Sequence, residues 1–447
     1  MRKLHDLTEG PIAKKMMALA LPLMGSSFLN MLYTLTDLFW VGGISTEAVA
    51  AVGICGFFFW MATSILLICN VGLAATVSQN YGRGDMKNAH EYINAGVKLN
   101  LIIGCIYAAI VFFFRESLLS FFNIQDDVTL AHALTYLKTM SPAFVLVFMN
   151  PILAVILNST GDSKATFKIS AIGVSVNMFL DFAFIRWFGM GIYGAALATA
   201  LAQVIVFFIY LTIGRKWNYL YYQVNYLKAW DTKKVKEILH LGLPPALQSS
   251  VHCFISMFIS RMVNDFGSAA VAAASIGSQV ESISWLTSEG FSTANVTFVG
   301  QNYGAGKHKR ANEAYFASMR IVVGIGIFAT LLLWLGRYPI MSLFLHEPEA
   351  LQLGALYLLI LSFSQLFMAV EIATAGAFNG LSMTKPPSIV GIAGNILRIP
   401  MAYALMQPFG VAGIWMAISI SSVIKGTVQV IWFHFAKHRR LHLENSV

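Results

Sequence analysis

The sequence QNYG occurs twice in the chain, at residues 79–82 and again at residues 301–304. The two copies lie 222 positions apart in a chain of 447 residues, and each is followed by glycine and basic residues. Other pairs have nearly the same spacing, about 219 to 222 positions: LPLMGSSFLNMLYTLTDLF at 21–39 resembles LPPALQSSVHCFISMFISR at 243–261, and GIYGAALATA at 191–200 resembles GVAGIWMAIS at 410–419. We therefore expect two halves with the same fold.

The composition is that of a membrane protein. Hydrophobic residues make up 57% of the chain and charged residues only 11%, whereas soluble domains carry roughly 25% charged residues. A net charge of +9 could indicate nucleic acid, since basic clusters attract phosphate. A bias of Lys and Arg toward the cytoplasmic side of a membrane explains it better, so we expect no nucleic-acid partner.

The apolar runs are long enough to cross a bilayer. Spans of about 20 apolar residues cross the hydrocarbon core, where only helices satisfy every backbone polar group. The sequence predicts an all-α integral membrane protein with twelve such helices. Their expected limits are 12–42, 46–79, 92–114, 129–158, 166–187, 191–214, 238–265, 268–302, 313–336, 349–380, 387–408 and 411–436.

Basic residues gather on one side of this topology. The termini and the even-numbered connections carry Arg2, Lys3, Arg83, Lys87, Lys164, Arg215, Lys216, Lys228, Lys233, Lys234, Lys236, Lys307, Lys309, Arg310, Lys385, Lys437, Arg439 and Arg440. The odd-numbered connections carry few bases and seven acids, namely Glu47, Glu116, Asp126, Asp127, Asp265, Glu347 and Glu349. We therefore expect both termini in the cytoplasm of a multi-pass cell-membrane protein.

The repeat predicts the domain limits. These are an N-terminal six-helix bundle at 1–214, a cytoplasmic linker at 215–237, a C-terminal six-helix bundle at 238–436 and a cytoplasmic tail at 437–447. Because six is even, both bundles enter the membrane from the same side, related by a pseudo-two-fold axis along the membrane normal. QNYG would then end the second and eighth helices, with Gly82 and Gly304 left-handed; direct substrate contact is the alternative.

Motifs for enzyme chemistry are missing from the sequence. The four cysteines lie in apolar runs without the spacing of a zinc site or a disulfide framework. The glycine pattern GMGIYG at 189–194 lacks the preceding strand that dinucleotide binding needs, so we expect a turn and close helix packing. The start of the chain lacks the features of a removable signal peptide. We predict that the protein is not an enzyme and has no cofactor.

Ionisable residues within the spans are the informative ones, because a charge at bilayer depth costs several kcal/mol and usually marks a pathway. Asp37 follows Tyr33 by four residues, and Asp181 follows Asn177 by four, so each pair lies on one helix face. Two carboxylates with an amide and a phenol offer hard oxygen ligands for a small cation, or sites for a proton. The alternative is that each Asp pairs with a polar neighbour or lines water.

The second half differs at these positions. The repeat places Ile259 opposite Asp37 and about Ile399 opposite Asp181, so the charged pocket is specific to the first half. Glu371 aligns with Asn150. A buried Glu371–Arg398 ion pair is one interpretation, and contact of Glu371 with a cationic substrate is the other.

We single out three further ionisable residues in the spans of the second half. His252 is expected as an interior histidine or a proton relay. Arg261 lies near an outer helix end. Lys425 extends from the last helix toward the membrane surface.

LTEGPIAKKMMALALPLM, YTLTDLFWVG, VSQNYGRGD, LNSTGDSK and FVGQNYGAGK occur in order along the chain. Together these segments resemble the multidrug and toxic compound extrusion (MATE) transporters over essentially the whole chain. The resemblance implies a twelve-helix antiporter that exports organic, often cationic, compounds against inward Na⁺ or H⁺ flow.

In the DNA-damage-inducible branch of that family, which the chain resembles most in its site residues, a cation site lies in the N-terminal bundle. The matching positions, and the implied Na⁺ ligands, are Asp37, Asn177, Asp181 and Thr199, with Tyr33 one turn before Asp37. Another branch has an acidic residue on the seventh helix where this chain has His252, which puts a C-terminal cation site in doubt.

We therefore predict a secondary active multidrug exporter coupled to Na⁺ or H⁺, acting as a monomer on drug-like molecules in the lipid bilayer. Glu371, His252, Asn150 and Arg398 form its candidate substrate or secondary polar site. The alternative is a flippase for lipid-linked saccharides or other lipids, since related families share this architecture. A groove lined by Arg would favour that alternative, and the spans contain little Arg beyond Arg261 and Arg398.

Overall fold

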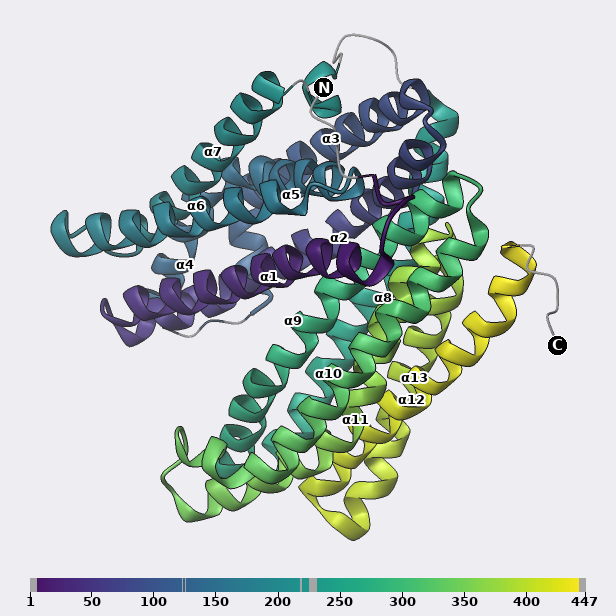
Figure 1. Ribbon diagram of the computed structural model, residues 1–447. Helices are drawn as coiled ribbons and strands as arrows, with labels where there is room; N and C mark the ends of the chain where they lie inside the picture. Colours follow the sequence, from purple (N-terminus) through teal and green to yellow (C-terminus); the bar gives the residue numbers. More distant parts are fainter. Residues whose placement is uncertain (1–5, 123, 125, 218, 225–230, 442–447) are drawn as a thin grey trace. The chain divides into compact units, whose positions relative to one another are not determined.

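The computed structural model describes residues 6–122, 124, 126–217, 219–224 and 231–441. Within these ranges every regular element is a helix, as Figure 1 shows. The expected cytoplasmic bases Arg2, Lys3 and Lys228 lie outside the described residues, as do parts of the expected linker and tail.

The helices follow one another through short connections. The first half contains α1 (Ile12–Gly42), α2 (Thr46–Arg83), α3 (Met86–Ser120), α4 (Asp127–Met140), η1 (Ser141–Ala143), α5 (Phe144–Ser159), α6 (Ser163–Asp181), η2 (Phe182–Trp187), α7 (Gly191–Trp217) and η3 (Leu220–Gln223). The second half contains α8 (Thr232–Asn264), α9 (Ser268–Gly304), α10 (His308–Ser342), α11 (Pro348–Gly380), α12 (Lys385–Phe409) and α13 (Val411–Arg440).

These elements form twelve long helical segments among the described residues, because α4–η1–α5 and α6–η2 are each continuous. Ten of the twelve are apolar enough over a long window to cross a membrane; α8 and α9 are just as long but carry more polar residues. Helices α3, α8 and α10 begin five or six residues before their expected limits of 92, 238 and 313. A helix satisfies its own backbone, so it continues past the apolar segment into water.

The described chain divides into two compact units, with limits that cut through two helices. The N-terminal unit is mainly Gly25–Gly242, and the C-terminal unit is Leu7–Met24 with the chain from Leu243 onward. The first part of α1 thus belongs to the C-terminal unit, and the first part of α8 to the N-terminal unit. We call Leu7–Met24 and Thr232–Gly242 the leading segments.

Large apolar side chains fill the interior of each unit. In the N-terminal unit, buried Phe144 and Phe148 pack on Tyr107 with ring centroids 5.2 and 5.5 Å apart. In the C-terminal unit, fully buried Trp415 packs on Tyr357 with centroids 5.3 Å apart. Each unit therefore has a core of its own.

The predicted role of Gly82 and Gly304 is wrong by two residues. Helix α2 continues to Arg83, and its left-handed cap is Gly84 at φ 79°. Helix α9 ends at Gly304, and the left-handed residue is Gly306 at φ 70°. QNYG therefore lies in the last helical turns, where its side chains are available for contacts.

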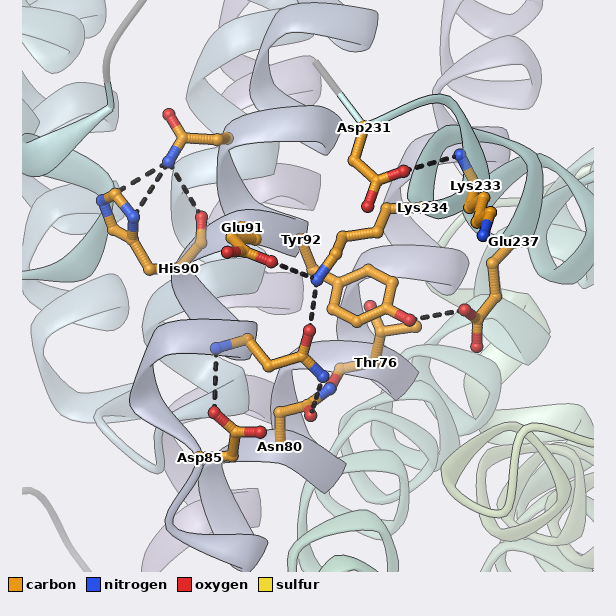
Figure 2. A network of polar contacts seen from close by, with 12 residues as sticks. Thr76, Asn80, Asp85, His90, Glu91, Tyr92, Asp231, Lys233, Lys234 and Glu237 are labelled. Carbon is orange, nitrogen blue, oxygen red and sulfur yellow. Dashed lines mark hydrogen bonds and ion pairs between the residues drawn. The ribbon is translucent and has the colours of Figure 1, made fainter. Parts of the chain in front are cut away.

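In the N-terminal unit, the residues after QNYG hold the leading segment of α8, as Figure 2 shows. The Lys234 ammonium lies 2.6 Å from Glu91 Oε2, donates to Asn88 Oδ1 and sits 4.7 Å from the Tyr92 ring centroid. Asn88 Nδ2 donates to Asn80 Oδ1 at 2.7 Å, which ties QNYG into the same network. We call this network the N-terminal clamp.

The second QNYG does the same for the leading segment of α1. Asn302 Nδ2 donates to the Leu7 carbonyl at 3.3 Å, and the Arg310 guanidinium donates to the carbonyls of Leu7 and Glu9 at 3.2 and 2.7 Å. The Lys307 ammonium lies 3.7 Å from Glu9. We call this the C-terminal clamp. Each QNYG motif therefore lies where its unit binds a leading segment from the other half of the sequence.

Two glycines allow the leading segment of α8 to lie directly against α2. A β-carbon on Gly72 would stand 2.5 Å from the Ile238 carbonyl oxygen, and one on Gly242 would overlap the Ile68 carbonyl. Small residues let membrane helices approach at backbone distance. This close approach of α8 to α2 holds Lys234 beside the residues that follow QNYG.

Candidate functional site

A polar pocket lies in the N-terminal unit, on α1, α6 and α7. Asp37 is 9% exposed on α1, Asn177 and Asp181 are fully buried on α6, and Thr199 is 2% exposed on α7. Tyr33, one turn before Asp37, is half-buried and interacts electrostatically with Asp37, Asp181 and Thr199. The structure thus brings Tyr33, Asp37, Asp181 and Thr199 together, and Asn177 lies one helical turn before Asp181.

Packing of α1 on α6 positions the two carboxylates. The rings of Trp40 and Phe182 lie 5.4 Å apart, and Gly25 leaves room for Phe167, because a β-carbon there would stand 2.6 Å from its ring. Directly after Asp181 the helix widens into the single π-helical turn η2, a feature often found at functional sites.

The GMGIYG motif turns the chain from η2 into α7. Gly189 and Gly191 have φ of 63° and 56°, values that glycine adopts without strain. A β-carbon on Gly194 would stand 3.1 Å from that of Phe184, so the helices pack closely here. The predicted turn and close packing are confirmed, and they bring Thr199 beside α6.

Several polar atoms of this pocket have no hydrogen-bond partner in the described part of the chain. The buried atoms without a hydrogen-bond partner among the described residues include Asp37 Oδ1, both amide atoms of Asn177, both carboxylate oxygens of Asp181 and Thr199 Oγ1. A buried polar atom left unpaired costs about 1–3 kcal/mol, and more for a charged group. Such a concentration is expected where an ion, a proton or water completes the site.

The donor set suits a small hard cation or a proton. Carboxylate, amide and hydroxyl oxygens are hard ligands. The described part of the chain contains no group of three or more His, Cys, Asp or Glu side chains of the kind that holds a transition metal. Buried Tyr136 on α4 also interacts electrostatically with Asp37 and Tyr33. Sequence reasoning missed it, because nothing local in TYLKTM points to a residue on a different helix.

A pocket opens beside this site. It has a volume of about 840 Å³ and is lined by residues 38–40, 42–44, 185, 186, 189 and 191, at the end of α1 and around the turn before α7. Leu38, which directly follows Asp37, forms part of its wall. The pocket therefore adjoins the end of α1 that carries Asp37.

Asn150 is not part of this pocket. Its amide Nδ2 donates to the side-chain and backbone oxygens of Gln203 on α7, at 2.7 and 3.0 Å. This neutral pair joins α5 to α7.

The equivalent helices of the C-terminal unit, α11 and α13, are joined by charges. Lys425 Nζ lies 3.2 Å from Glu371 Oε1, and both residues are less than 10% exposed. The expected Glu371–Arg398 ion pair is therefore wrong, and so is the expectation that Lys425 extends to the membrane surface. Gln429 Nε2 also donates to the Glu371 carbonyl at 2.7 Å.

Arg398 lies near this pair but bonds elsewhere. Its Nε donates to Ser421 Oγ at 3.0 Å, and its side chain is 6% exposed. His252 on α8 is exposed rather than interior, and it interacts with Asn395, Arg398 and Lys425. The C-terminal unit thus gathers His252, Glu371 and Arg398 into one neighbourhood.

Glu281 on α9 belongs to the same neighbourhood and was missed. Its carboxylate accepts hydrogen bonds from Gln365 Nε2 at 3.1 Å and Tyr357 OH at 3.4 Å. The residue lies inside the expected span 268–302, so the test applied to Asp37, a charge within an apolar span, would have found it.

Known proteins resemble the chain over its whole length. It is 26% identical to the probable multidrug resistance protein NorM of Thermotoga maritima, covering 94% of this chain and 92% of that protein. It is also 26% identical to the FAD transporter of Shewanella oneidensis, covering 95% of both.

Solved structures share the fold. A MATE protein in the straight conformation superposes with a TM-score of 0.92 at 22% identity, covering 99% of this chain and 100% of that one. The bent form of the Vibrio cholerae MATE transporter VcmN gives 0.89 at 19% identity, covering 96% and 98%. The predicted all-helical, two-lobe, twelve-helix membrane fold is confirmed.

The MatE family model matches residues 22–183 and again residues 244–404, once in each half of the repeat. The family consists of multi-pass membrane transporters rather than enzymes. The chain belongs to the MatE family of multidrug efflux transporters.

Proposed function

We propose that this protein is a secondary active antiporter of the cell membrane, which exports organic cations and amphipathic compounds in exchange for Na⁺ or H⁺. The coupling ion binds in the N-terminal unit at Asp37 and Asp181, with Asn177, Thr199 and Tyr33 completing the site. Both termini face the cytoplasm.

The observation that supports this proposal best is the set of unpaired buried atoms on Asp37, Asn177, Asp181 and Thr199. Asp37 interacts electrostatically with Asp181, so the two carboxylates repel each other when both are charged. A bound Na⁺ or proton removes that repulsion and occupies the unpaired oxygens. The ion therefore binds more tightly to a conformation in which this pocket is closed than to one in which it is open. Such a difference in affinity is what coupling by population shift requires.

The pocket beside the site supports ion entry from outside. Its walls are the end of α1 and the turn before α7, which the distribution of basic residues assigns to the external side. An inward ion gradient would then load the site directly.

The substrate class follows from composition and from the relatives' names. The chain contains 33 Phe and 20 Met, residues suited to surfaces that repack around varied apolar molecules. The relative from Staphylococcus haemolyticus, 24% identical over 94% of this chain, is named a multidrug export protein. The Shewanella relative carries FAD by its name, so overall similarity does not choose the substrate.

The test is dye efflux from proteoliposomes under a Na⁺ gradient and a pH gradient imposed separately. Wild type should move a fluorescent organic cation under one gradient, and Asp37→Asn should lose that movement while still inserting in the membrane. Ser175→Ala on α6 is a matched control, because this exposed hydroxyl bonds only its own helix, at the Ala171 carbonyl. Normal efflux by Asp37→Asn would exclude the mechanism, and no efflux under either gradient would favour the lipid flippase.

A further inference from the structure

The buried charges of the C-terminal unit are not equally satisfied. Glu371 is paired with Lys425 at 3.2 Å, and Glu281 accepts hydrogen bonds from Gln365 and Tyr357. Both carboxylates thus already have donors, so a cationic ligand would have to displace one of them.

Two glycines hold these donors in place. A β-carbon on Gly394 would overlap the Lys425 side chain, and one on Gly277 would overlap the Tyr357 ring. Lys425 therefore lies along α12 on its way to Glu371, and Tyr357 lies against α9 next to Glu281. These close contacts fix the donors on the two carboxylates rather than leaving them free to exchange.

Arg398 is the exception. Nε donates to Ser421, while the two terminal nitrogens make no hydrogen bond or ion pair with any described residue. Glu371 and Glu281 act on the guanidinium electrostatically without reaching ion-pair distance. A guanidinium presents five N–H donors in a planar fork that matches a carboxylate or phosphate, so most of the binding capacity of Arg398 is unused.

The neighbourhood also has an open side. His252 is exposed on α8, Glu281 is half-buried on α9, and Arg398 lies deeper at 6% exposure. Because His252 interacts with Arg398, the guanidinium lies next to the exposed part of this neighbourhood. Two carboxylates nearby keep the cluster neutral overall, which disfavours a free small anion and favours an anionic group carried on a molecule that also has a positive charge.

We propose that Arg398 binds the carboxylate or phosphate oxygens of a transported zwitterion in the C-terminal unit. This inference deepens the proposed function and rests on it. Ser421 orients the guanidinium. The protein then exports zwitterionic compounds through Arg398 and purely cationic ones without it.

The test compares two forms of one dye in proteoliposomes. A rhodamine methyl ester is a cation, and the free acid of the same rhodamine is a zwitterion. In Arg398→Gln we expect efflux of the free acid to fall about tenfold or more, because a buried charge partner is lost, while efflux of the ester stays within about twofold. Arg398→Lys should retain part of the free-acid efflux, because it keeps the charge but not the fork.

Fluorescence anisotropy of the same two dyes on purified protein provides a measurement that needs no ion gradient. The free acid should bind Arg398→Gln more weakly than wild type, with the ester unchanged. The double variant Arg398→Gln/Glu281→Gln restores the neutral cluster, so it serves if the single variant is poorly folded, and it should show the same selective loss.

The outcomes separate the two proposals. Wild type that moves neither dye but binds the free acid through Arg398 contradicts the proposed function and keeps this inference. Equal loss of both dyes in the single and the double variant, or no loss of either, overturns it. Release of the free acid from wild type by excess anionic lipid, with the ester retained, would assign the guanidinium to a lipid headgroup and also overturn it.

Discussion

The two units place their buried charges in opposite ways. In the N-terminal unit Asp37 Oδ1 and both Asp181 oxygens are buried without hydrogen-bond partners among the described residues, as are the Asn177 amide and the Thr199 hydroxyl. In the C-terminal unit Glu371 is buried against Lys425, and Glu281 against neutral donors. The same repeat has thus produced one pocket that needs a ligand to be satisfied and one cluster that is largely satisfied by the chain itself.

This difference predicts that substitutions at the two sites have different consequences. An unpaired buried carboxylate destabilises the ligand-free protein, and a charge at bilayer depth usually marks a functional site. A buried ion pair costs much when one partner is removed, because the other is left as an uncompensated charge. Variants in the first pocket should therefore affect transport, and variants that break the Glu371–Lys425 pair should affect folding.

The largest effect on stability is expected from breaking the C-terminal pair. Lys425→Met should lower the free energy of unfolding by about 3–5 kcal/mol, since Glu371 keeps a buried charge. The double variant Glu371→Gln/Lys425→Met should recover most of that loss. Thermal unfolding of the purified protein in detergent measures both.

The neutral pair Asn150–Gln203 is the matched control for this prediction. Gln203→Met removes the side-chain bond of the Asn150 amide but keeps its bond to the Gln203 carbonyl, so it should cost less, about 0.5–1.5 kcal/mol. If Lys425→Met costs no more than Gln203→Met, the two pairs are equivalent and the contrast between the units fails.

The second prediction concerns ion-linked stability. A saturating coupling ion should stabilise the wild type by about 2.7 kcal/mol at 100 times its Kd. Asp181→Asn should abolish this ion-dependent shift while leaving the stability of the ion-free protein equal or higher, because an unpaired charge has been removed. Melting curves in Na⁺, in K⁺ and across pH measure the shift. An undiminished shift in the variant would place the ion elsewhere.

The two clamps also differ in how well their ion pairs are buried, and the expected effect on stability is smaller. The Lys234–Glu91 contact is 2.6 Å and its ammonium is mostly buried, whereas the Lys307–Glu9 contact is 3.7 Å and exposed. Lys234→Gln should cost about 1 kcal/mol, and Lys307→Gln almost nothing. Hydrogen exchange of the α8 and α1 leading segments distinguishes them; equal protection losses would contradict the difference.

The smallest effect is expected at the starts of α4 and α11. Asp126 caps α4 by accepting from the Thr129 backbone and hydroxyl, whereas Glu347 before α11 makes no side-chain cap. Hydrogen bonds from Thr129 hold the pKa of Asp126 below its ordinary value. The cap is thus fully present above the ordinary carboxyl pKa and is lost as pH falls through the lowered one.

Acid should consequently increase amide exchange at the start of α4 but not of α11. Asp126→Asn keeps a capping oxygen without a titrating proton, so it should remove the pH dependence. Persistence of that dependence in the variant would assign it to another group.

The sequence by itself determined the number, type and approximate limits of the helices. Long apolar runs in a bilayer must be helical whatever they pack against, so α1, α9 and α11 begin within a residue of their expected positions. The sequence also determined that Tyr33 and Asp37, like Asn177 and Asp181, share a helix face, because each pair is one helical turn apart; the packing of α1 on α6 is what brings the two pairs into one pocket.

Only the tertiary structure decided which distant side chains meet. Glu371 had Arg398 and Lys425 as possible partners, and the choice of Lys425 depends on the close approach of α12 and α13 at Gly394. The exchange of leading segments likewise rests on contacts between residues hundreds of positions apart, such as Asn302 with Leu7. Hydrophobic runs and helical spacing describe one helix at a time, whereas these pairings depend on how helices pack, which no local pattern records.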